Sequence, residues 1–237
     1  MNWLQSDMIQ NEIKGDWSEL PRESLAVLVS GGLDSAILLA ESLRFYKRVF
    51  PIYIQNGLHW ENTELVYLGE FLQRIATPAL GKLTVLQQPI EDVYGVHWST
   101  TGENIPDANS ADDAVFLPGR NILLLTKSII WCHLHKIDHI ALAPLGSNPF
   151  PDATPAFFRE FSQVMNQAIM GKVKIIRPYG ALNKVSVLQI GRDFPLEWTF
   201  SCIQPIDGVH CGCCNKCAER KIGFQSALMT DPTVYKN

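Results

Sequence analysis

The sequence predicts an α/β fold, in which a mostly parallel sheet carries helices on both faces. Short apolar stretches alternate with segments of helical periodicity along most of the 237 residues. A glycine-rich turn also joins the first apolar stretch to the first helical one. Strands that alternate with helices form parallel sheets covered on both sides, and ligands bind at the carboxyl ends of those strands. Hydrophobic residues make up 46% of the chain and charged residues 19%, which suits a sizeable core.

The first part of the chain is expected to supply three strands and two helices. Residues 25–29 are apolar and favour a strand, and apolar positions recur at helical spacing from Asp34 onward. Further strands are expected at 48–57 and 82–88. Between them, residues 61–76 place apolar side chains on one side of a helix.

The second part of the chain continues the alternation. An apolar helix is expected at 119–136 and a strand at 138–145. A Thr-Pro start and a Gly end bound a helix at 154–171. A fifth strand is expected at 173–178 and a short helix at 183–193. The five strands and their helices therefore predict one sheet covered on both faces.

Residues 90–116 interrupt this pattern. They are polar and lack periodicity, so a long loop is expected, and loops of this length in a compact domain are usually functional or mobile. For the domain organisation we expect an α/β domain at 1–200. A cysteine-rich segment with a C-terminal helix packed on it is expected at 201–237.

Charge and hydropathy argue against several classes of protein. The net charge of −4 provides no broad attraction to nucleic acid or to an anionic membrane. No apolar run reaches the ~18 residues that span a bilayer, and the first 20 residues lack the basic start and apolar core of a signal peptide. We therefore expect a cytoplasmic protein that acts on small molecules, without direct nucleic-acid binding.

The glycine-rich turn has the sequence Ser30-Gly31-Gly32-Leu33-Asp34-Ser35. A strand, a tight turn and a helix N-terminus in this order direct unpaired N–H groups and the positive end of the helix dipole at one point, which suits a phosphate. The turn lacks the Gly-Lys-Ser/Thr ending of a Walker A loop. A simple strand-to-helix connection is the alternative interpretation, but the added hydroxyls and carboxylate favour an anion site.

The cysteines near the C-terminus indicate a metal site. Cys202, Cys211, Cys214 and Cys217 have the spacing Cys-x8-Cys-x2-Cys-x2-Cys, and four thiolates suit a closed, structural zinc site. An iron–sulfur cluster, a disulfide pair, or His210 as a substitute ligand remain alternatives. The adjacent Cys213 is expected to be a free thiol.

The glycine-rich turn resembles the pyrophosphate loop of the N-type ATP pyrophosphatases. Together with the cysteines, it makes the chain resemble the QueC (ExsB) family, whose members include 7-cyano-7-deazaguanine synthases. The resemblance runs from about residue 25 to 225. It rests on the stretches "LVSGGLDS", "FLPGRNILLL", "NPFPDATPAFFREF", "NKVSVLQIG", "TFSC" and "CAER".

This resemblance implies a Rossmann-like fold of the adenine nucleotide alpha hydrolase type with a zinc segment, usually as a homodimer. It also implies that ATP and Mg²⁺ are used to adenylate the carboxylate of 7-carboxy-7-deazaguanine, with release of pyrophosphate. Ammonia would displace AMP to give an amide, and a second ATP would activate the amide for dehydration to a nitrile. An amide ligase with another acceptor, such as a protein terminus, and a zinc-containing nucleic-acid-binding module are the alternatives.

The resemblance also assigns roles to individual residues. Asp34, Ser35 and Lys184 are expected to be catalytic, with Asp34 capping the helix or holding Mg²⁺. Phe150 is expected to stack on the substrate ring, and Asp152 to accept hydrogen bonds from its guanine-like edge. The expected ATP-binding residues are Val29, Ser30, Gly31, Gly32, Leu33, Asp34, Ser35, Ala36 and Arg120.

Each assignment has a structural alternative. Asp34 could be a plain N-cap, Arg120 a member of a surface ion pair, Lys184 a solvated lysine and Asp152 part of a turn. No role is assigned to three further loop residues: His59, His97 and Trp98.

Three short segments depart from the pattern of familiar members of this family. Residues 54–60 stand where an Asp-Tyr-Gly-Gln type stretch is usual, and Asn148-Pro149-Phe150 where Ser-Gly-Tyr is usual. Val115-Phe116 replaces an Asn-Thr pair. These departures fall near the expected substrate side and leave the phosphate loop and the cysteines intact.

Overall fold

One sheet of five parallel strands, in the order β3-β2-β1-β4-β5, forms the centre of the molecule. The computed structural model describes residues 15–17 and 22–236. The expected α/β fold is confirmed, although β4 and β5 have only three residues each and are shorter than expected. The strands are β1 (Ser24–Leu28), β2 (Arg48–Gln55), β3 (Thr84–Gln87), β4 (His139–Ala141) and β5 (Lys174–Ile176).

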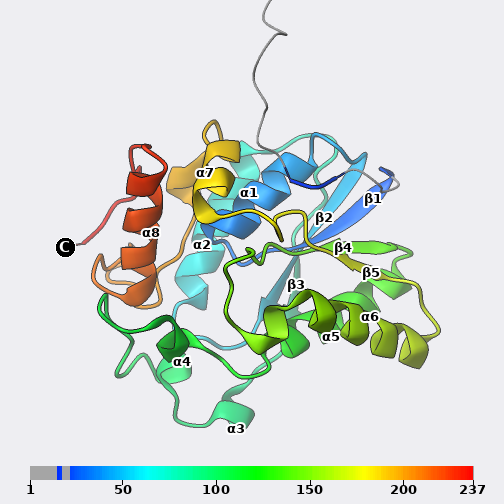
Figure 1. Ribbon diagram of the computed structural model, residues 1–237, viewed down its shortest axis with the longest axis horizontal. Helices are drawn as coiled ribbons and strands as arrows, with labels where there is room; N and C mark the ends of the chain where they lie inside the picture. Colours follow the sequence, from blue (N-terminus) through cyan, green and yellow to red (C-terminus); the bar gives the residue numbers. More distant parts are fainter. Residues whose placement is uncertain (1–14, 18–21, 237) are drawn as a thin grey trace, which may run out of the picture.

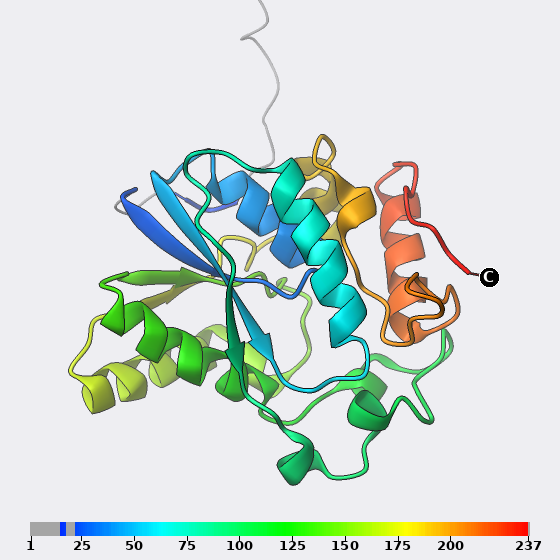
Figure 2. The same cartoon turned by 180° about the vertical axis from the view of Figure 1, so that it is seen from behind.

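Helices cover both faces of this sheet (Figure 1 and Figure 2). Helices α1, α2 and α7 lie on one face and α5 and α6 on the other, while α8 packs against α7 at the edge. The helices are α1 (Leu33–Ser42), α2 (Glu61–Arg74), α3 (Glu91–Tyr94), α4 (Trp98–Thr101), α5 (Arg120–Leu134), α6 (Pro155–Ile169), α7 (Lys184–Ile190) and α8 (Asn215–Ser226), with 3-10 turns at Asp112–Val115, Pro151–Ala153 and Leu196–Trp198.

The central strand β1 contributes side chains to two separate cores. Leu25 and Val27 pack with apolar residues of α1, α7 and α8, whereas Ala26 and Leu28 pack with those of α5 and α6. Successive side chains of a strand point to opposite faces, so a strand that is covered on both sides is apolar throughout. This explains why the first strand is a continuous apolar run.

The segment 90–116 is not the continuous loop that its sequence predicts. It contains the one-turn helices α3 and α4 and a 3-10 turn. The His97 side chain accepts a hydrogen bond from the Ser99 N–H at the start of α4, and Gly102 ends that helix with a φ of +77°. Helices of four residues are too short for a period of 3.6 residues to be visible in the sequence.

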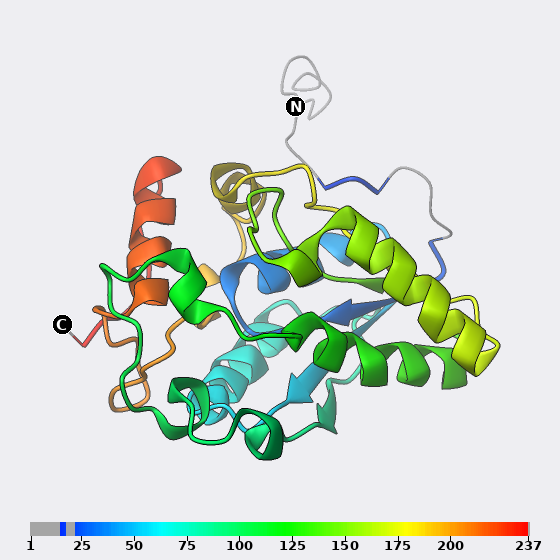
Figure 3. The same cartoon turned by 60° about the horizontal axis from the view of Figure 1, so that its bottom comes forward.

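The same segment lies beside the cysteine-rich segment (Figure 3). The Ala108 N–H donates to the Cys213 carbonyl at 3.0 Å, and the Asn215 N–H donates to the Pro106 carbonyl at 3.0 Å. Within the described ranges, every helix falls short of the length and hydrophobicity that crossing a membrane needs.

The strand order places a ligand-binding crevice beside β1. The chain passes from β1 through β2 to β3 on one side, and then returns to place β4 and β5 on the other side of β1. The strand order therefore reverses between β1 and β4. In open parallel sheets, ligands bind at the carboxyl ends of the strands at such a switch point.

Candidate active site and metal centre

A cleft of about 360 Å³ opens at this switch point. Residues that follow β1 and β4 line two of its sides, and the start of α5 and residues 148–152 line a third. Residues 200–203 and the first turns of α8 complete the wall. The cleft therefore brings together the glycine-rich turn, the loops of the sheet and the cysteine-rich segment.

Glycine at position 31 lets the chain turn tightly between β1 and α1. Gly31 has a φ of +73°, a conformation that residues with a side chain rarely adopt. A Cβ atom here would also lie 2.9 Å from Cγ of Glu64 on α2. The turn therefore needs glycine both for its conformation and for the close approach of α2.

The turn presents donors to the cleft. The Ser30 N–H donates to Ser35 Oγ at 3.1 Å, and the two serine hydroxyls lie 3.1 Å apart. The N–H groups of Leu33 and Asp34, in the first turn of α1, have no acceptor among the described residues. Free N–H groups at a helix N-terminus bind anions, so the geometry agrees with a phosphate site.

Asp34 pairs with Lys184 across the cleft. Lys184 Nζ donates to the two carboxylate oxygens of Asp34 at 2.9 and 2.7 Å and lies 3.4 Å from Oε1 of Glu219. Burial lowers the pKa of Lys184, but Asp34 and Glu219 outweigh this effect and the pKa is raised. The N-cap of α1 is Gly32, without a side-chain hydrogen bond. The expectation that Asp34 caps the helix is therefore wrong. The alternative that Lys184 is a solvated lysine is also wrong, because Lys184 is paired with Asp34.

Arg120 is the first residue of α5 and lines the cleft. It follows Gly119, whose φ of +73° turns the chain into the helix. No described residue forms an ion pair with Arg120, so the surface ion pair is not observed. Its Nε is enclosed and has no hydrogen-bond partner among the described residues. An anion in the cleft would find this guanidinium unpaired.

Asp152 and Phe150 line the cleft beside the start of α5. Oδ2 of Asp152 accepts a hydrogen bond from the Asn121 N–H at 2.9 Å, so one carboxylate oxygen supports the start of α5. No described residue donates to its Oδ1. The Phe150 ring stacks on Phe116 with centroids 4.9 Å apart, and both rings line the cleft. These contacts are compatible with the roles in substrate binding that the resemblance predicts for both residues.

Two buried glutamates on α2 were not expected from the sequence. Glu61 accepts hydrogen bonds from the N–H groups of Asn56 and Gly57, both at 2.7 Å. Glu64 accepts one from the Tyr53 hydroxyl at 2.5 Å. Burial raises the pKa of Glu61, and it raises the pKa of Glu64 to about 8. Their spacing of three residues places both on one face of α2, but the sequence does not show that this face lines the cleft.

The three unassigned loop residues divide between the cleft wall and the surface. Trp98 stacks on Trp60, which lines the cleft, with centroids 5.9 Å apart. His97 is the N-cap of α4, and its Nδ1 lies 2.8 Å from the Ser99 hydroxyl. His59 is exposed. Of the three, only Trp98 supports a residue of the cleft directly.

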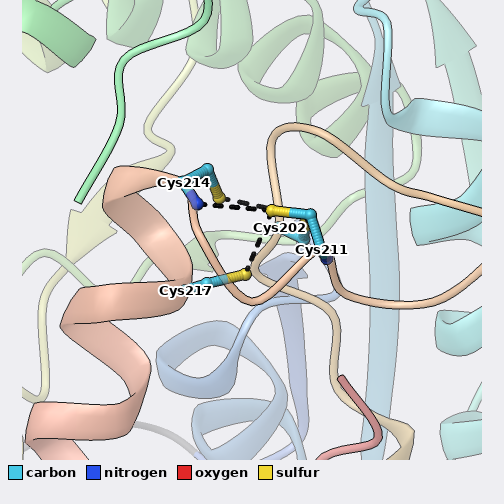
Figure 4. A group of neighbouring side chains, drawn as sticks. All are labelled: Cys202, Cys211, Cys214 and Cys217. Carbon is cyan, nitrogen blue, oxygen red and sulfur yellow. Dashed lines mark hydrogen bonds between the residues drawn. The ribbon is translucent and has the colours of Figure 1, made fainter. Parts of the chain in front are cut away.

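The four expected cysteine ligands converge on one point (Figure 4). Their sulfur atoms all lie within 4.8 Å of one another, and all four residues are buried. The Sγ atoms of Cys202 and Cys214 are 3.9 Å apart, as are those of Cys211 and Cys217. Tetrahedral zinc–thiolate bonds of about 2.3 Å would place sulfurs about 3.8 Å apart, so the group fits a single metal ion.

Backbone donors surround these sulfurs. The N–H groups of Gln204 and Cys211 donate to Cys202 Sγ at 3.3 Å, and those of Cys213 and Cys214 donate to Cys211 Sγ at 3.4 and 3.3 Å. Hydrogen bonds from Cys202 and Cys217 lower the pKa of Cys214, whereas the hydrogen bond with Cys214 raises the pKa of Cys202. Such surroundings stabilise thiolates, which are the form that binds metal.

The two neighbours that could have replaced a ligand lie outside the group. The His210 ring is fully buried and its Nε2 accepts a hydrogen bond from the Ser201 N–H at 3.2 Å. Burial and the nearby Arg220 lower the pKa of His210 to about 3. Cys213 is exposed. The geometry therefore selects the four cysteines that the spacing indicated.

Comparison with known proteins places the chain in a family. The sequence model described as "Queuosine biosynthesis protein QueC" matches residues 24–228, which include the glycine-rich turn and all four clustered cysteines. The chain belongs to the QueC family.

Curated relatives of this QueC protein carry one functional name. A protein named "7-cyano-7-deazaguanine synthase 1" from Mesorhizobium japonicum is 29% identical, over 89% of this chain and 93% of its own length. A "7-cyano-7-deazaguanine synthase" from Rhizobium johnstonii is 27% identical, over 89% and 91%. Among solved structures, an NMN synthetase from Francisella tularensis is 14% identical with a TM-score of 0.44, covering 89% of this chain and 79% of that one.

The segments in which this QueC protein departs from the familiar pattern meet in the cleft. Residues 54 and 60, Val115 and Phe116, and Asn148 and Phe150 all line it. These three segments, which are distant in the sequence, therefore line the same cleft as the glycine-rich turn.

Proposed function

We propose that this QueC protein converts 7-carboxy-7-deazaguanine and ammonia to 7-cyano-7-deazaguanine at the expense of ATP. The observation that carries the proposal is the glycine-rich turn at the switch point, whose Asp34 is paired with Lys184 of α7 in the lining of the cleft. The functional name that these curated relatives share supplies the product, and the family resemblance supplies the carboxylate substrate.

The turn is suited to hold the β- and γ-phosphates of ATP. The free N–H groups of Leu33 and Asp34 and the hydroxyls of Ser30 and Ser35 would bind phosphate oxygens. Arg120 would place its unpaired guanidinium against the same charge. Mg²⁺, when bound beside Asp34, would neutralise part of the charge on the phosphates. Pyrophosphate held in this way is a stabilised leaving group.

The other side of the cleft is suited to the deazaguanine. Oδ1 of Asp152 is available to accept hydrogen bonds from a guanine-like edge, and Phe150 lies where it can pack on the ring. The substrate carboxylate would then face the α-phosphate and attack it, forming an adenylate. Ammonia displaces AMP to give the amide, and a second adenylation removes the amide oxygen to give the nitrile.

The four-cysteine group is suited to a structural zinc ion. Zinc bound by four thiolates leaves no open position for water, so it would supply stability and no catalytic step. Its ligands come from the start of α8 and from the residues that precede it. The ion would therefore fix α8 against the wall of the cleft.

The nucleotide products test this proposal. We expect AMP and pyrophosphate, with two ATP consumed per nitrile and the amide as an intermediate, when purified protein is incubated with ATP, ammonium and the carboxylate. If both carboxylate oxygens carry ¹⁸O, each AMP should acquire one ¹⁸O by mass spectrometry. Reactions without the carboxylate or without ammonium are the controls.

Other products would point elsewhere. One ATP consumed per stable amide would support an amide ligase instead of a nitrile synthase. ADP as the main nucleotide product would contradict adenylation, because a kinase or an ordinary ATPase transfers the γ-phosphoryl group.

A further inference from the structure

Glu64 lies beside the phosphate loop, in the wall of the cleft. It is one turn into α2, only 6% exposed, and close enough to Gly31 that no side chain fits between them. No role has been assigned to it above. A buried carboxyl group at the edge of a reaction site needs an explanation, because burial of a charge is costly unless the charge is paired.

The hydrogen bonds of Glu64 are incomplete. Its Oε2 accepts the Tyr53 hydroxyl, but no described residue donates to its Oε1. Other buried glutamates of this chain use both oxygens: Glu61 binds two backbone N–H groups, and Glu41 binds the Gly15 N–H and the side chains of Trp17 and Tyr179. Both oxygens of Glu41 and of Glu61 are thus engaged in structural hydrogen bonds, whereas Glu64 keeps one oxygen available to the cleft.

The charged neighbours of Glu64 favour exchange of a proton near neutral pH. Burial raises its pKa to about 8, while Tyr53 on β2 and Arg120 on α5 lower it and Glu61 on its own helix raises it. Arg120 makes no ion pair with this carboxyl group among the described residues. A general base works best when its pKa is close to the working pH.

We propose that Glu64 accepts the proton that the amine nitrogen loses when it attacks the adenylate. The inference rests on the proposed function, which supplies the adenylate and ammonia. The nitrogen forms a bond to the carbonyl carbon, and the bond from that carbon to the AMP oxygen breaks, with its electron pair leaving on AMP. One N–H proton passes to Oε1 of Glu64 and later to water, which restores the carboxylate.

Two partial reactions distinguish proton acceptance by Glu64 from a role of Glu64 in ATP binding. Exchange of labelled pyrophosphate into ATP, dependent on the carboxylate substrate, reports adenylation and needs no amine. Amide formation needs the proton acceptor. In Glu64→Gln, which keeps the size of the side chain, we expect exchange to remain within about threefold of the wild type and amide formation to fall by about 100-fold or more. Glu41→Gln is the matched control, because Glu41 is equally buried but lies outside the cleft.

The pH dependence provides a second readout. In the wild type, the rate of amide formation should rise with pH as Glu64 loses its proton around pH 8, and Glu64→Gln should lack this component. Tyr53→Phe should move the rise to higher pH, because the Tyr53 hydrogen bond lowers the pKa of Glu64. This second variant keeps the proposal testable if Glu64→Gln does not fold.

Each result decides between the possibilities. Equal loss of exchange and amide formation in Glu64→Gln would place Glu64 in the ATP site and overturn the proposal, as would full retention of both. An unchanged pH profile in Tyr53→Phe would also overturn it. A wild-type protein that shows no exchange would contradict the proposed function itself.

Discussion

The glycine-rich turn and the four-cysteine group both gather backbone N–H donors, but only the four-cysteine group is closed. Four donors already bind the cysteine sulfurs, and the four cysteines are at most 1% exposed. In the loop, Ser30 is exposed and the N–H groups of Leu33 and Asp34 have no acceptor among the described residues. We therefore expect the four-cysteine group to retain a bound ion and the glycine-rich turn to exchange its ligand.

The closed site also supports the open one. Cys214 is the N-cap of α8 and Cys217 lies in its first turn, two residues before Glu219. Glu219 binds Lys184 and Lys216, and Lys184 in turn binds Asp34 at the phosphate loop. A metal held by the cysteines would therefore hold a charged wall of the cleft in place, although it takes no part in the reaction.

Removing a ligand of the closed site should have the largest effect on stability. In Cys202→Ser or Cys214→Ser we expect loss of the metal and of soluble, folded protein, because structural zinc contributes on the order of 10 kcal/mol to the folding of small zinc domains. Elemental analysis should find about one zinc per wild-type chain, and a chelator should lower the melting temperature. Iron with visible absorption, or a folded wild-type protein without metal, would contradict a structural zinc site at the four cysteines.

Changes in the open site should affect the reaction and leave the fold intact. In Asp34→Asn and in Ser30→Ala we expect carboxylate-dependent ATP consumption to be lost, because in the proposed function these side chains serve pyrophosphate binding and neither belongs to an apolar core. The melting temperature should move by only a few degrees, since the Asp34–Lys184 pair is partly exposed. Calorimetry and a pyrophosphate assay measure the two effects. A stable, fully active Asp34→Asn protein would show that the turn is only a connection.

Both candidate sites could be located from the sequence because the residues of each lie close together along the chain. The turn between 30 and 35 and the cysteines between 202 and 217 each lie within a short stretch, and their spacing alone restricts the chemistry. The alternation of strands and helices likewise predicted the parallel sheet, because an apolar run or a helical period needs no knowledge of distant residues.

Features that depend on contacts between distant residues could not be predicted. Asp34 and Lys184 are separated by 150 positions, so the sequence leaves a plain N-cap as an alternative for Asp34, and only the fold shows that the two side chains are paired. From the sequence alone, Glu64 would be expected on the surface of an amphipathic helix. Only the packing of α2 against Gly31 and Tyr53 buries it. The role of a residue in this cleft is therefore set by the strand order, which periodicity does not reveal.

The smallest effect is expected at Cys213, which tests how sharply the closed site is bounded. Its side chain is exposed, while its neighbours Cys211 and Cys214 are buried in the four-sulfur group. Its backbone N–H donates to Cys211 Sγ, and serine keeps that N–H. In Cys213→Ser we therefore expect an unchanged metal content and a stability change within about 0.5 kcal/mol, as at other exposed positions. A loss of metal comparable to that in Cys214→Ser would show that Cys213 belongs to the metal site.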